Sequence, residues 1–182
     1  HYVIAYVAAT NGLVVSPATI TVAAVGSEAY RESPTLGYSD DAPGGISLTG
    51  TLSCTTAGGQ SLAGLPLGTY TIEAASCSGF TPSNSTDYVI SYVGAHDGFV
   101  VDPATVTVTV SGTETYNVGP SFTYADDAPS GVNLTGTVGC TEAGGEPLSD
   151  GLLVGNYTLV ASSCGGLTPS DSTDYVLSYV GA

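Results

Sequence analysis

The chain repeats most of its sequence once and then begins a third copy. Residues 1–7 read HYVIAYV, and the pattern returns as DYVISYV at 87–93 and as DYVLSYV at 174–180, offsets of 86 and 87 residues. A period of this length repeats whole domains rather than the turns of a solenoid. The single-residue difference falls within 62–68, whose counterpart is 148–155. The chain is therefore expected to hold two tandem small domains.

The cysteines are shared equally between the two copies. Cys54 and Cys77 are 23 residues apart in the first, and Cys140 and Cys164 are 24 apart in the second. A disulfide closing a loop of this size removes about 3 kcal/mol of unfolded-state freedom, a large gain for a small domain. Without CxxC spacing or neighbouring histidines, a zinc site is the weaker interpretation. Two disulfides indicate an oxidising compartment, so we predict an extracellular or cell-surface protein.

The charge balance excludes several kinds of partner. Sixteen acidic residues accompany one basic residue, Arg31, for a formal net charge of −15. A field of this sign repels nucleic acid. No apolar run reaches the roughly 18 to 20 residues of a membrane span, so no membrane insertion is expected.

The hydrophobic pattern has the period of β-strands and predicts an all-β fold. Thr alternates with aliphatic residues at 19–22 and 105–110, and further strands are expected at 68–72, 155–159 and 88–93. Their number and spacing favour two tandem small β domains of the immunoglobulin-like sandwich type. A β-grasp-like mixed sheet is the alternative.

The pairs Asn11-Gly12 and Asp97-Gly98 predict hairpin turns, because both residue types tolerate positive φ. Each is followed by a short apolar strand that runs directly through a proline, Pro17 or Pro103, into the next copy. A junction without a Gly/Ser linker predicts a stiff, extended array.

With these domain boundaries, the chain is expected to have a spare strand at its N-terminal end and to lack one strand at its C-terminal end. Residues 17–102 form a complete domain, residues 103–182 form a second domain that lacks its last strand, and residues 1–16 form an orphan C-terminal hairpin of a preceding repeat or a donor strand. The spare strand is Gly12, Leu13, Val14 and Val15. An added strand satisfies the backbone groups of a sheet edge, so head-to-tail strand complementation into a filament is one hypothesis. The other is a piece or repeating unit of a longer array.

Three segments carry a resemblance to a known family. They read LTGTLSC at 48–54, LGTYTI at 67–72 and DYVISYVG at 87–94, and they recur in the second copy. This pattern resembles the MBG repeat domains, which occur in tandem in bacterial secreted and adhesin-like surface proteins. The resemblance implies a small all-β module of an extracellular array and carries no catalytic residues.

Nothing in the sequence indicates an enzyme. The histidines are His1 and His96, and the counterpart of His96 is Thr10, so a catalytic histidine would be missing from the sister domain. No nucleophile elbow or phosphate loop occurs. No cofactor is expected, apart from the calcium considered next.

Paired carboxylates recur at one turn of each copy, where Asp40-Asp41 and Asp126-Asp127 are each followed by Ala-Pro. Hard oxygen ligands of this kind make a calcium site possible, although Asp and Pro also favour plain turns. Possible glycosylation sequons begin at Asn84, Asn133 and Asn156.

The first functional hypothesis is an extracellular structural protein, a stalk or filament subunit whose partners are neighbouring repeats or further copies of itself. The alternative is an adhesin module that binds a glycan or protein through the glycine-rich loops 55–66 and 141–154.

Overall fold

The computed structural model describes residues 1–143, 148 and 152–181, and it confirms an all-β fold. The strands of the first repeat are β1 (Ala18–Ala29), β2 (Thr35–Asp40), β3 (Leu48–Ser53), β4 (Gly68–Tyr70), β5 (Ser78–Pro82), β6 (Tyr88–Val93) and β7 (Phe99–Asp102). Those of the second are β8 (Ala104–Thr115), β9 (Val118–Asp126), β10 (Leu134–Gly139), β11 (Gly165–Pro169) and β12 (Tyr175–Gly181). Single 3₁₀ turns, η1 (Ala74–Ser76) and η2 (Ala161–Ser163), precede β5 and β11.

The chain groups into two compact units. One contains residues 1–26, 35–62 and 69–99, and the other contains 27–34, 63–68 and 100–182.

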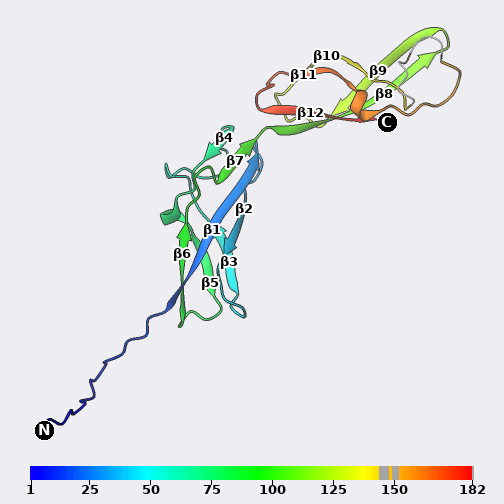
Figure 1. Cartoon of the computed structure of the whole chain (residues 1–182). Helices are drawn as coiled ribbons and strands as arrows, with labels where there is room; N and C mark the ends of the chain where they lie inside the picture. The colour runs from blue at the N-terminus through cyan, green and yellow to red at the C-terminus, as the bar shows by residue number, and fades with distance from the viewer. Residues whose placement is uncertain (144–147, 149–151, 182) are drawn as a thin grey trace. The chain divides into compact units, whose positions relative to one another are not determined.

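In the first repeat, the long strand β1 organises the larger sheet, whose order is β2-β1-β7-β4 with β6 also paired to β1 (Figure 1). β6 runs parallel to β1 from Ala18 opposite Tyr88 to Ala23 opposite Val93. Farther along β1, β7 pairs with the same edge of that strand. The Gly26 N–H donates to the Gly98 carbonyl at 2.8 Å.

The expected hairpin at Asp97-Gly98 is therefore wrong. Asp97 does adopt a positive φ of 54°, as the sequence indicates. However, the strands on either side of it both run parallel to β1, so the turn offsets the chain along one edge instead of reversing it. The local signal fixes the backbone of the turn, while pairing with β1 fixes the direction in which the chain leaves it.

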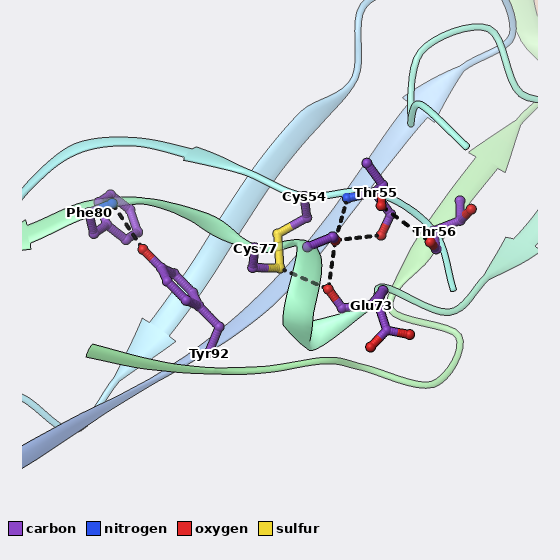
Figure 2. Close-up of a disulfide and its surroundings, with 8 residues drawn as sticks. Cys54, Thr55, Thr56, Glu73, Cys77, Phe80 and Tyr92 are labelled. Carbon is purple, nitrogen blue, oxygen red and sulfur yellow. Dashed lines mark hydrogen bonds between the residues drawn. A yellow bond between two sulfur atoms is a disulfide. The ribbon is translucent and has the colours of Figure 1, made fainter. Parts of the chain in front are cut away.

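β3 and β5 form a separate antiparallel pair closed by the Cys54–Cys77 disulfide (Figure 2). Gly50 lies in this ladder at φ +116°, and a Cβ there would collide with the Gly79 carbonyl. The Phe80 N–H donates to the Tyr92 hydroxyl at 2.9 Å, which links this pair to β6 of the larger sheet. Figure 2 shows the Tyr92 side chain reaching across to Phe80.

The second repeat has the same kind of strand pair, disulfide and tyrosine hydrogen bond. β10 and β11 pair antiparallel, the Cys140–Cys164 disulfide joins their ends, and the Leu167 N–H donates to the Tyr179 hydroxyl at 3.2 Å. β12 runs parallel to β8 from Ala104 to Val110, and β9 pairs antiparallel on the other edge.

Alternate residues of the two long strands form the cores. Ile20, Val22 and Ala24 of β1 are buried, as are Val106, Val108 and Val110 of β8. The intervening threonines of β8 are at least partly exposed, in keeping with the alternation of Thr and Val in the sequence.

One predicted strand is absent from the second repeat. Residues 68–70 form β4, but their counterparts 155–157 form no strand in the described structure. The bridge between Leu159 and Glu142 has an equal in the first repeat, where Ile72 pairs with Thr56. β4 pairs with β7, and the described part of the second repeat has no strand in the position of β7. The local sequence is therefore insufficient, because a short strand needs a ladder partner.

Candidate strand-acceptor site

In the first repeat, β7 fills the edge of β1 beyond the end of β6. Phe99 and Val101 are 0% and 3% exposed, so alternate side chains of β7 enter the core. The Tyr30 N–H donates to the Asp102 carbonyl at 2.8 Å, which completes the pairing. This edge is closed by backbone hydrogen bonds and by buried apolar side chains.

At the corresponding edge of the second repeat the described structure shows no paired strand, and the counterpart of β7 would follow Ala182. β12 pairs with β8 only as far as Val110, and in the described structure residues 111–115 pair with β9 alone. We call residues 111–116, on the side away from β9, the acceptor edge. Beside it lies a cavity of about 410 Å³, whose lining includes Gly112, Phe122, Leu152, Val154, Tyr157 and Leu159.

Both edges have a glycine at the same position. The large side chain that lies over this glycine comes from a different strand in each repeat. A Cβ on Gly26 would lie 2.9 Å from Leu36 and 3.0 Å from Phe99, so these two side chains meet over the glycine. At the matching Gly112, a Cβ would lie 3.0 Å from Phe122, which occupies the sequence position of Leu36. The large ring comes from β7 in the first repeat and from β9 in the second.

A buried carboxylate also distinguishes the repeats. Glu28 is 3% exposed, and its Oε1 accepts a hydrogen bond from the Gly64 N–H at 3.1 Å. Both carboxylate oxygens of its counterpart, Glu114, are buried and have no partner among the described residues. The counterpart of the Gly64 loop falls within 149–151, outside those residues.

The donor segment, residues 12–15, is exposed. Leu13 and Val15 are 84% and 86% exposed, while Asn11 has the positive φ of 58° that matches Asp97 in the first repeat. Residues 1–16 form one turn and no strand in the described structure (Figure 1, blue), and their assignment as the hairpin of a preceding repeat or a donor strand stays a prediction.

The residues considered for calcium serve as backbone acceptors. The Thr21 N–H donates to Asp41 Oδ1 at 2.6 Å, and this hydrogen bond holds the pKa of the Asp41 carboxyl below its ordinary value. Asp40 Oδ1 accepts from the Ala42 N–H at 2.9 Å. Asp126 and Asp127 make the matching bonds in the second repeat. In the residues that the structure covers, no three His, Cys, Asp or Glu side chains gather into a metal-binding group.

The three sequons begin in segments outside the strands. The Asn84 side chain accepts hydrogen bonds from the Thr86 and Asp87 N–H groups and donates to the Asp87 carboxylate at 2.8 Å. Asn133 and Asn156 are exposed, and Asn156 lines the cavity beside the acceptor edge.

Several residues of the site are not apparent from the sequence. Gly112, Phe122 and Glu114 carry no motif, and their importance follows from what Gly26, Leu36 and Glu28 do in the first repeat. The signal available in the sequence is their alignment at an offset of 86 residues, which places Leu opposite Phe.

No family model, no curated protein and no solved structure matches this chain. In the described residues no helix is long and apolar enough to cross a membrane.

Proposed function

We propose that the protein is an extracellular structural repeat protein, a stalk or filament subunit, that acts through strand pairing between repeats rather than through catalysis. One observation carries the proposal: two repeats with matching sheets, each with its own disulfide, follow one another with Pro103 alone between β7 and β8. Complementation head-to-tail through residues 1–16 would join copies into a filament.

The connectivity between repeats supports a load-bearing role. β7 ends at Asp102 and β8 begins at Ala104, so a single proline joins the two strands. A proline restricts φ and leaves no flexible linker at this point. Each repeat is also closed by its own disulfide, which limits how far the chain can extend if a domain opens under tension.

We propose that each repeat is an immunoglobulin-like sandwich. What supports this is that the first repeat has a larger sheet and the separate pair β3-β5, linked by the hydrogen bond from the Phe80 N–H to the Tyr92 hydroxyl. The parallel pairing of β1 with β6 gives the larger sheet a mixed character, which keeps a β-grasp-like arrangement as the alternative.

The proposed location is the cell exterior, in the kind of array to which the resemblance to MBG domains points. Two disulfides are compatible with an oxidising compartment. Thiol alkylation under denaturing conditions, applied to protein taken from the producing organism, tests the location. Four protected cysteines are expected, and four alkylated cysteines would refute it.

An adhesin module that binds a glycan or protein through its loops is the second candidate. In loop 55–66, Leu62 and Leu65 are each 4% exposed, so the loop packs its apolar residues inward. Loop 141–154 lies partly outside the described residues. Retention of the purified chain on a glycan array, lost on substitution of exposed residues in loop 55–66, would favour this candidate over the structural one.

A further inference from the structure

Residues 27–34 come from the first repeat by sequence but belong to the second compact unit. We propose that this unit carries a docking surface for the β1–β2 turn of the preceding repeat, with Tyr30 as the inserted side chain and Arg31 as the charge that holds it. Tyr30, Arg31 and the residues that they contact all lie within the second unit. The inference rests on the proposed structural function and specifies the contact by which one repeat couples to the next.

The centre of the docking surface is apolar. Ala104, Val106 and Tyr175 are buried and form one cluster. The partly buried residues that pack against this cluster are Tyr30, Ala128, Val132 and Leu177. The Tyr30 ring meets the Tyr175 ring edge to face, with 5.7 Å between centroids and 82° between planes. Aromatic pairs favour this geometry beyond the gain from burial alone, so Tyr30 is an integral part of the cluster.

Two backbone hydrogen bonds hold the chain on either side of Pro103. The Tyr30 N–H donates to the Asp102 carbonyl at 2.8 Å, and the Ala104 N–H donates to the Asp174 carbonyl at 2.9 Å. Tyr30 and Asp174 therefore bind the junction between the repeats through their backbones, while their side chains interact with each other. Docking of the turn is thus coupled to the conformation of the junction.

Polar and charged groups give the contact its specificity. Hydrogen bonding to the Asp174 carboxylate raises the pKa of the Tyr30 phenol above its ordinary value. The Arg31 guanidinium carbon lies 5.2 Å from the centre of the Tyr30 ring, within cation–π range, and its charge is attracted to Asp174. Arg31 is the single Lys or Arg of the sequence, so no neighbouring side chain of this kind can take its place.

The backbone of Arg31 also points to a role for its side chain. Its φ is +62°, at the third position of a turn that the Glu32 N–H closes onto the Ala29 carbonyl. This position favours glycine or asparagine. The counterpart in the second repeat is Asn117, with a φ of +63°. Because asparagine serves the same turn, an arginine at this position is better explained by what its side chain contacts.

The main test is amide exchange in the full chain, read at Ala104 and Tyr175 and compared with Ile20 and Val22 in the first unit. Tyr30→Ala removes the ring from the cluster and should speed exchange at Ala104 and Tyr175 at least about 30-fold, with Ile20 and Val22 unchanged. Tyr30→Phe is the matched control, because it keeps the ring and loses only the hydroxyl. It should speed exchange about threefold.

A charge exchange tests the role of Arg31. Arg31→Glu places a second carboxylate beside Asp174 and should speed exchange at Ala104 about threefold. Arg31→Asn, which installs the residue of the second turn, should have a smaller effect. Adding Asp174→Lys to Arg31→Glu should restore the wild-type rate, a result that a change in packing alone would not produce.

Exchange at Ala104 that Tyr30→Ala leaves unchanged, or that rises equally at Ile20 and Val22, would overturn the docking surface. Failure of Asp174→Lys to rescue Arg31→Glu would overturn the role of Arg31. None of these results refutes the proposed function, since the disulfides and the extracellular location do not depend on this contact. Four reduced cysteines in the organism's own protein would refute the extracellular function and leave the docking contact intact.

Discussion

The same strand edge has two different states in the two repeats. In the first, β7 pairs with β1, and β4 forms beside it. In the second, residues 111–115 pair with β9 alone in the described structure, and residues 155–157, the counterpart of β4, form no strand. The difference shows that β4 depends on its neighbour more than on its own sequence, because short strands gain stability from cross-strand contacts.

Other features are the same in both repeats and do not depend on that edge. The disulfides, the tyrosine hydroxyl bonds to Phe80 and Leu167, and the aspartates that accept from Thr21 and Thr107 all recur. Changes at β7 should therefore affect the repeats unequally, while changes at the shared features should affect them equally.

The largest expected effect is that of Phe99→Ala. Removing this fully buried ring should destabilise the first repeat by about 3 to 5 kcal/mol and expose the amides of β4 to exchange. Its counterpart Leu13→Ala should leave the unfolding of an unassembled chain unchanged, because Leu13 is exposed. Denaturant titration with amide exchange measures both, and equal losses would show that the two segments have equivalent roles in the monomer.

Loss of one disulfide should have a smaller effect that is the same in both repeats. The bridged cysteines are 23 and 24 residues apart, so replacing either pair by serine should cost about 3 kcal/mol. Urea unfolding of the two double variants provides the comparison. A loss confined to the first repeat would indicate that the second disulfide is not needed to hold its domain closed.

The smallest expected effect concerns pH. The Thr21 N–H lowers the pKa of Asp41 in the folded state, so this bond stabilises the fold above the ordinary carboxyl pKa of about 3.9 and ceases to do so as pH falls through the folded pKa. Asp41→Asn should therefore lessen the decline in melting temperature between about pH 5 and pH 2. At pH 7 its effect should be slight, since Asp41 is exposed. An unchanged acid profile would mean that the hydrogen bond contributes nothing measurable.

Much of the fold follows from the sequence because the relevant signals are local or repeated. Alternation of Thr with Val predicts β8, and the even division of Cys54, Cys77, Cys140 and Cys164 predicts the two disulfides. The positive φ of Asp97 also follows from its position before glycine.

The errors concern pairing, which is not local. Asp97-Gly98 reads as a hairpin turn, but β6 and β7 both pair parallel to the distant strand β1. Residues 155–159 read as a strand, but a strand requires a neighbour. The contact of Leu36 with Phe99 over Gly26 joins residues far apart in the sequence, so no single segment predicts it. Phe122 is recognised as part of the site only because it occupies the sequence position of Leu36.

A chain that carries a counterpart of β7 after Ala182 tests strand complementation most directly. The sequence of residues 10–16 would be added after Ala182, since Ala8-Ala9 occupies the position before Thr10 that Gly181-Ala182 occupies at the end of the second repeat. The control is the same extension with aspartate in place of its second valine. The measurement is unfolding of the second repeat followed by amide exchange at residues 111–116, together with sedimentation. Burial of two aliphatic side chains should stabilise the second repeat by about 3 kcal/mol, protect these amides and abolish association between copies. An extension that leaves stability, protection and association the same as in its control would contradict strand complementation.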